Sequence, residues 1–183
     1  MKKHFAAILC MVIVVGMSMT GCGNSSDVQD SSTIENSSIS SQNSQTYQTG
    51  SNVTELVVRF GDDGVPFTMH LEDNSTAAAI AGYVGTTEWR LPVYSYDESD
   101  VMEYYDIPSY YEIPDNSETV SEAHAGDVFY SDPNRIILYY HDAVINEEYT
   151  KIGTFDATDE FVSAVENNPV LEGWGNQIVI ISD

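Results

Sequence analysis

The chain has 183 residues, of which 29 are Asp or Glu and only 6 are Lys or Arg, and its formal net charge at pH 7 is −23. Nucleic acids and anionic lipid surfaces are both bound through clustered Lys and Arg side chains. The composition therefore excludes nucleic acid as a partner, and it excludes charge-driven attraction to a membrane surface.

The first 21 residues have the pattern of a secretory signal. Lys2 and Lys3 precede an apolar run from Phe5 to Met17, and the small residues of Met19-Thr20-Gly21 come directly before Cys22. The apolar run is too short for a membrane-spanning helix, which needs roughly 20 residues. An ordinary secretory signal with a chance cysteine is the alternative to a lipoprotein signal.

The segment before Cys22 resembles the bacterial lipobox, although Met19 stands where that motif usually has Leu. The resemblance implies removal of residues 1–21, acylation of Cys22 by fatty acids such as palmitate, and an extracytoplasmic protein held to the membrane by its lipid. Two or more acyl chains are needed for stable anchoring. Cys22 would then be the only cysteine of the mature chain, in which 4 Lys and Arg stand against 29 Asp and Glu, a formal charge near −25.

Residues 22–52 are predicted to be a disordered tether. The segment is rich in Ser, Asn, Gln and Thr and has few apolar residues, so it cannot bury enough surface to offset the entropy of ordering. Residues 53–183 are predicted to form one domain, which we expect to be a monomer without disulfides.

Strand and helix patterns follow one another through residues 53–183. Apolar residues alternate with polar ones at residues 56–60 and 67–71, with Asp63-Gly64 as the turn of a hairpin. Asn74-Ser75 can cap a helix whose apolar face contains Ala77, Ile80, Ala81 and Val84, and Gly85 is a plausible end. A strand is predicted at 89–93, at a sheet edge or with a bulge because Pro92 lacks a backbone donor.

The second half of the domain is read in the same way. The prolines of the tyrosine-rich segment 104–114 predict an extended loop. Strands are predicted at 128–131, 136–140, 149–155 and 177–181, and the apolar run 136–140 is expected to be buried on both faces. Thr158 can cap a second helix, which ends at Asn167-Asn168-Pro169. About eight short strands with two short helices predict a mainly β fold, a closed or nearly closed β-barrel.

The domain resembles the bacterial cyclophilin-like domain family. The resemblance rests on Val65 to Ser75, on the Ile-Pro pairs at 107–108 and 113–114, on Ala125 to Tyr130, and on Ile136 to His141 followed by Tyr149 to Gly153. It implies a cyclophilin-type barrel but no particular activity, because fold and function must be argued separately. Motifs like Phe-His-Arg-Ile-Ile and Gln-Gly-Gly-Asp-Phe, which the catalytic cyclophilins have, are absent from the sequence.

Two sets of residues are candidates for a functional site. Arg90 is the nearest counterpart of the cyclophilin arginine and a weak catalytic candidate, since alternation with Trp89 and Leu91 places it on the solvent side. Tyrosine presents a rigid apolar ring with a polar tip, which suits ligand and peptide surfaces. The predicted ligand-binding residues are Tyr94, Tyr96, Tyr104, Tyr105, Tyr110 and Tyr111.

No metal site or cofactor is predicted, because the histidines lack metal-ligand spacing and no phosphate loop or dinucleotide fingerprint is present. The sequence leaves open whether the acidic clusters bind Ca²⁺ weakly. The preferred function is a non-catalytic binding module for a peptide or a small apolar ligand. The alternatives are a peptidyl-prolyl isomerase for exported proteins and a structural interaction domain without a small ligand.

Overall fold

The computed structural model describes residues 53–95 and 98–183. Cys22, the predicted signal and tether, and Tyr96 lie outside the described residues. The described part contains nine strands and two helices: β1 (Glu55–Phe60), β2 (Pro66–Leu71), α1 (Ser75–Val84), β3 (Trp89–Val93), β4 (Met102–Asp106), β5 (Glu118–Ala123), β6 (Asp127–Ser131), β7 (Arg135–Tyr139), β8 (Ala143–Phe155), α2 (Asp159–Glu166) and β9 (Gln177–Ser182).

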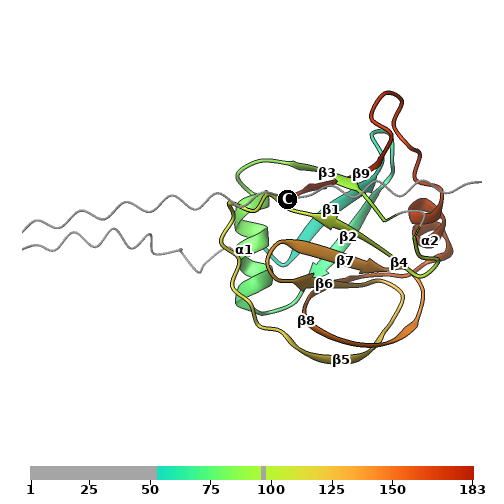
Figure 1. Ribbon diagram of the computed structural model, residues 1–183. Coiled ribbons are helices and arrows are strands. Elements are labelled where there is room, and N and C mark those ends of the chain that lie inside the picture. Colours follow the sequence, from blue (N-terminus) through green and yellow to red (C-terminus); the bar gives the residue numbers. More distant parts are fainter. Residues whose placement is uncertain (1–52, 96–97) are drawn as a thin grey trace, which may run out of the picture. The chain divides into compact units, whose positions relative to one another are not determined.

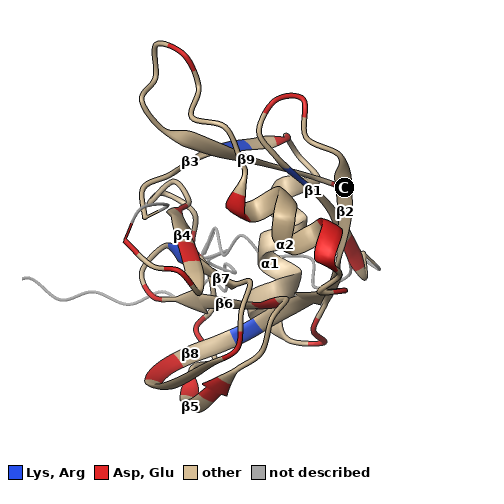
Figure 2. Cartoon of the chain, turned by 90° about the vertical axis from the view of Figure 1, so that its right-hand side faces the viewer, with Lys and Arg blue, Asp and Glu red and all other residues tan. Residues whose placement is uncertain are grey.

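Eight of these strands close an antiparallel barrel, which confirms the predicted fold class. The strands lie in the order β2-β1-β9-β3-β4-β7-β6-β8, and β2 pairs with β8 to complete the ring. The closing pairs are Met69 with Phe155, His70 with Thr154 and Leu71 with Gly153. The view in Figure 2 shows the strands around the two helices, with α2 in front of α1.

The two helices fill the two ends of the barrel. Figure 1 shows α1 at one end and α2 at the other, with the strands between them. As predicted, α1 begins after the cap Asn74, whose side chain accepts a hydrogen bond from the Ala77 N–H, and Thr158 caps α2 by accepting one from Phe161. Their buried side chains join the strand side chains in one core: Ala77, Ile80, Ala81, Val84, Phe161 and Val165.

The long strand β8 belongs both to the barrel and to a hairpin outside it. Its second half closes the barrel, and its first half pairs with β5 outside the ring. Side chains of this outer hairpin pack against Phe129, Ile137 and Tyr139 on the outer face of β6 and β7 in a second apolar cluster. This cover explains why β7 is buried on both faces, as its continuous apolar run predicted.

Three details differ from the sequence predictions. Strand β3 is not at an edge: Trp89 to Val93 pair with Ile181 to Gln177 of β9 without a register shift, while β4 lies on the other side. Pro92 is tolerated there because β4 is in register with β3 only at Val93. Strand β4 begins the segment that was expected to be a loop, and β5 was not predicted. Within the described residues, no helix is long and apolar enough to cross a membrane.

Candidate functional site

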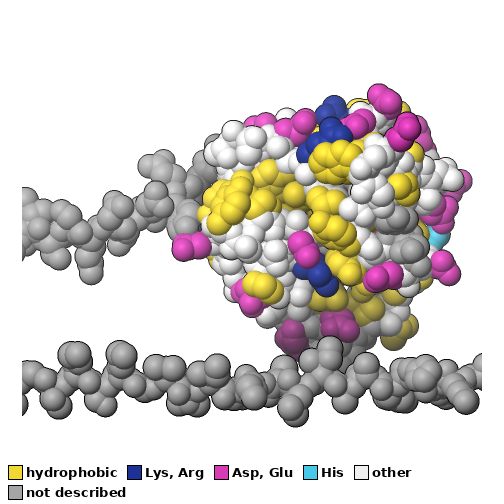
Figure 3. Space-filling model, turned by 45° about the horizontal axis from the view of Figure 1, so that its top comes forward, with side chains coloured by type: hydrophobic (Ala, Val, Ile, Leu, Met, Phe, Trp, Pro, Cys, Tyr) yellow, Lys and Arg dark blue, Asp and Glu magenta, His cyan; other side chains and the backbone are white. Residues whose placement is uncertain are grey.

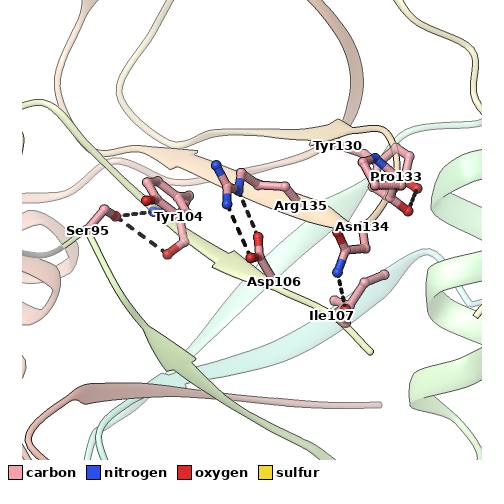
Figure 4. A network of polar contacts seen from close by, with 8 residues as sticks. All are labelled: Ser95, Tyr104, Asp106, Ile107, Tyr130, Pro133, Asn134 and Arg135. Carbon is pink, nitrogen blue, oxygen red and sulfur yellow. Dashed lines mark hydrogen bonds and ion pairs between the residues drawn. The ribbon is translucent and has the colours of Figure 1, made fainter. Parts of the chain in front are cut away.

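The tyrosines that were predicted to bind a ligand lie in separate places. Tyr105 faces the barrel interior from β4 and is 1% exposed, whereas its neighbour Tyr104 lies on the outer face. The centre of the Tyr104 ring is 3.8 Å from the guanidinium carbon of Arg135. Figure 4 shows that guanidinium group pointing to Asp106, with which it makes two hydrogen bonds of 2.7 and 3.2 Å. Tyr94 is half exposed just after β3.

Tyr110 and Tyr111 belong to a different surface, beside α1. The centre of the Tyr111 ring lies 4.3 Å from that of Tyr83 on α1, 5.4 Å from that of Trp89 on β3 and 4.6 Å from that of Tyr110. Tyr110 is 75% exposed, and a hydrogen bond with Tyr111 raises its pKa. These two tyrosines stay candidates for an exposed ligand surface, and their ring contacts include none of Tyr94, Tyr104 and Tyr105.

Arg90 lies on the outer face of β3, as strand alternation predicts. Its guanidinium nitrogens are 2.6 and 2.7 Å from the two carboxylate oxygens of Asp62, and its carbon is 5.7 Å from the centre of the Trp174 ring. Both side chains of the ion pair are less than half exposed. The arginine is thus tied to an acid outside the barrel and faces away from the apolar interior.

A cavity at the α2 end of the barrel is lined in part by Glu103, a buried carboxyl group. Its volume is about 210 Å³. Strand β4 contributes Glu103 to its wall and β9 contributes Gln177, while α2 contributes Val165 and Glu166. Ser99 and Asp100, just before β4, and Tyr140, just after β7, complete this list of lining residues.

Glu103 is a carboxyl group inside the barrel. It is 2% exposed, because it occupies an inward position of β4 next to Tyr105. Its Oε1 atom is buried and has no hydrogen-bond partner among the described residues. Burial raises the pKa of Glu103 from 4.5 to about 8, since the charged form loses its hydration. Glu103 is therefore mostly protonated at neutral pH.

Gln177 brings a second unpartnered oxygen to the same cavity wall. Its Nε2 donates a hydrogen bond of 2.7 Å to the backbone carbonyl of Asn168, and its buried Oε1 has no partner in the part of the chain that the structure describes. A carbonyl oxygen can only accept, so the amide nitrogen of Gln177 must face it, and the free atom must be the oxygen. Asn168 is held in the same way, because its Nδ2 donates to the Ile178 carbonyl at 3.0 Å.

The remaining polar groups of the wall are acidic or already bonded. The Tyr140 hydroxyl donates to the Ser99 carbonyl at 2.9 Å. Burial raises the pKa of Tyr140, and the negative charges of Glu103, Asp100 and Glu166 raise it further. Glu166 is 3.0 Å from His141 Nε2. The charges of three carboxyl groups thus raise the pKa of the same tyrosine, so all three carboxyl groups lie close to Tyr140.

Neither Glu103 nor Gln177 was singled out from the sequence. Both signals were present: Glu103 stands two positions from Tyr105 on one face of a strand, and Gln177 has the same alternation as Val179 and Ile181. A polar residue in register with core positions is the pattern that could have found them. Across residues 53–95 and 98–183, no group of three or more His, Cys, Asp or Glu side chains is arranged to hold a metal ion.

Comparisons with known proteins agree with the fold. The sequence model of the cyclophilin-like family matches residues 60–171, and no curated protein sequence matches the chain. McbB, solved in complex with tryptophan, has a similar structure with a TM-score of 0.50 and 15% identity over 69% of this chain, which spans only 44% of McbB. The hypothetical protein AF2241 from Archaeoglobus fulgidus gives a TM-score of 0.45 and 17% identity, covering 70% of this chain and 93% of its own.

Proposed function

Because the chain belongs to the cyclophilin-like family, we propose that its barrel is a binding module for a small ligand, and that the ligand site is the cavity lined by Glu103 and Gln177. The module works outside the cytoplasm, where the lipid on Cys22 keeps it at the membrane. Binding rather than chemistry is its primary role.

The buried, unpartnered carboxyl group of Glu103 is the observation that carries this proposal. Buried polar atoms are nearly always hydrogen-bonded, and leaving one unbonded costs about 1–3 kcal/mol. The same free energy can be recovered when a ligand supplies the missing partner. Glu103 and Gln177 provide two such atoms in one wall, next to a cavity of about 210 Å³.

Ligand binding at this cavity can be tested by thermal unfolding with a library of small molecules. We expect a ligand to raise the melting temperature of the wild-type protein and to have a much smaller effect on Glu103→Gln. Glu118→Gln is the matched control, because Glu118 is an exposed acid on β5, outside the barrel. A ligand that stabilises the wild type and Glu103→Gln equally would place its site elsewhere and contradict the proposal.

Prolyl isomerisation, the alternative suggested by the fold, gains no support from the described residues. The arginine that would act on the prolyl nitrogen has to face an apolar pocket, but Arg90 is paired with Asp62 on the outer surface. The aromatic surface of Tyr110 and Tyr111 could add a contact for a longer ligand such as a peptide. It lies beside α1, whereas the cavity is lined by α2, so we assign the primary site to the cavity.

A further inference from the structure

The charge of the domain limits which ligands the cavity can accept. The described residues include four Lys and Arg side chains, and each forms an ion pair: Arg59 with Glu88, Arg90 with Asp62, Arg135 with Asp106 and Lys151 with Asp127. Figure 3 shows basic side chains on one face next to acidic ones. The described residues that line the cavity include three carboxyl groups and no Lys or Arg. An anionic ligand would meet repulsion there and find no counter-charge.

The free hydrogen-bonding groups of the wall point to the same conclusion. The unpartnered atoms, Glu103 Oε1 and Gln177 Oε1, are both oxygens. The donors of Tyr140 and of the Gln177 amide are already bonded to backbone carbonyls. Gln177 Oε1 can only accept, and so can Glu103 once it has lost its proton, so a ligand that donates hydrogen bonds satisfies both oxygens when Glu103 is ionised. A protonated primary amine offers three donors and a positive charge, which favours the ionised carboxylate.

The cavity also offers contacts for carbon atoms. Val165 of α2 and the ring of Tyr140 form part of its wall. A bare metal cation would gain nothing from these apolar groups, whereas an alkyl chain attached to an ammonium group would bury surface against them. The rim acids Asp100 and Glu166 add attraction for a cation as it enters.

On these grounds, and resting on the proposed function, we propose that the cavity binds a small organic molecule through a protonated primary amine, whose N–H groups donate to Glu103 and Gln177. The ligand class is that of alkylamines and related ammonium compounds. The amine enters as an ammonium ion, and its carbon chain lies against Val165 and Tyr140.

Binding of this kind exchanges a proton with the solvent. Glu103 is protonated at neutral pH in the free protein, so it must release one proton to water to form the carboxylate–ammonium pair. No other bond forms or breaks. The titratable groups around Glu103 are Tyr105 from its own strand, Tyr140 after β7, Asp100 before β4 and Glu166 from α2. Burial raises the pKa values of both tyrosines, so neither of them supplies or takes up this proton near pH 7.

Isothermal titration calorimetry with three probes of similar length tests the ligand class: n-butylammonium, n-butanol and butyrate. We expect butylammonium to bind at least about tenfold more tightly than the other two. Its observed binding enthalpy should differ between phosphate and MOPS buffers by the amount that corresponds to one released proton, and neither buffer contains a primary amine. The affinity should rise about tenfold from pH 6 to pH 7, as one displaced proton requires.

Two variants separate the contributions of the wall. Glu103→Gln should lose the proton release and the pH dependence while keeping a neutral side chain of the same shape. Gln177→Met should weaken butylammonium binding severalfold and keep the proton release, and Glu118→Gln should behave as the wild type. Thermal unfolding of each variant, measured without probe, checks that it is folded.

The failure of this inference differs from the failure of the proposed function. If butanol or butyrate binds as tightly as butylammonium in a Glu103-dependent way, the cavity is a ligand site but the amine assignment is wrong. If K⁺ or Ca²⁺ alone binds there and displaces butylammonium, the site is for inorganic cations. If no molecule of the library binds in a Glu103-dependent way, the proposed function fails and the inference fails with it.

Discussion

At the scale of single residues, Glu103 is the side chain with the largest measurable consequence. A carboxyl group in the barrel interior holds its proton more tightly than the same group in the unfolded chain, with a pKa of about 8 against 4.5. Between these values the folded protein binds more protons than the unfolded one. The contribution of Glu103 to stability is therefore complete below about pH 4.5 and is lost as the pH rises towards 8.

This difference predicts how stability changes with pH in the Glu103→Gln variant. The variant cannot ionise at this position, so its free energy of unfolding should increase relative to that of the wild type as the pH increases, which makes the variant relatively more stable. We expect the gap to grow by about 1.4 kcal/mol per pH unit between pH 5 and pH 7.5, since one proton is linked to unfolding in this window. Urea unfolding at a series of pH values measures it. A gap independent of pH would show that Glu103 is already ionised in the folded protein.

At the scale of secondary-structure elements, the sequence predicted those whose signals are local. Alternation identified β1 and β2, and the side chains of Asn74 and Thr158 identified the starts of both helices. Strand β5 was not predicted because its sequence, Glu118 to Ala123, is mostly polar. Its pairing with β8 and its packing on β6 and β7 are what stabilise it. Strand β4 was obscured by the prolines that follow it.

The candidate site was less predictable than the fold. Its walls come from β4, β9 and α2, which are distant in the sequence, and the strand order β9-β3-β4 places β4 and β9 on either side of β3. The sequence predicted a ligand site in the tyrosine-rich segment instead, but Tyr104 and Tyr105 lie on opposite faces of β4. Clustering in the sequence along a strand does not imply clustering in space, because successive side chains point in opposite directions.

Replacing glycine by alanine at two positions tests how much the close contact between β2 and β8 contributes to stability. A Cβ atom on Gly153 would lie 2.7 Å from the His70 carbonyl oxygen and 3.1 Å from Met69 Cγ, so Gly153→Ala should push the two strands apart. We expect a loss of about 1–3 kcal/mol in the free energy of unfolding.

Gly82→Ala is the control for this substitution. Gly82 is exposed on α1 with nothing within 4 Å of an added Cβ, so alanine should stabilise the helix by about 0.5–1 kcal/mol. Denaturant unfolding of both variants measures the two changes. Equal effects of the same sign would show that the tight contact between β2 and β8 does not limit stability.

At the scale of the whole molecule, the proposed attachment of the chain to the membrane depends on one thiol. After the predicted signal of residues 1–21, the sequence contains no cysteine besides Cys22 and is strongly negative, so its charge would not bind it to an anionic membrane without a lipid. We expect Cys22→Ala to move the protein from the membrane fraction to the soluble exported fraction. Cell fractionation with a high-salt wash measures this shift. Retention of the variant on washed membranes would contradict the lipid anchor.

The hairpin of β5 and β8 has a consequence for molecules that stand close together. Closing the ring gives every barrel strand a neighbour on each side, but among residues 53–95 and 98–183 β5 pairs only with β8, and no described strand covers its other edge. An open strand edge can recruit a strand of another molecule and start aggregation. Here that edge belongs to a strand with exposed acids, Glu118 and Glu122, and Glu147 and Glu148 are exposed on the adjoining part of β8. Copies that stand close together, as the proposed lipid anchor would hold them on one membrane, would therefore repel each other at the place where their sheets could otherwise join.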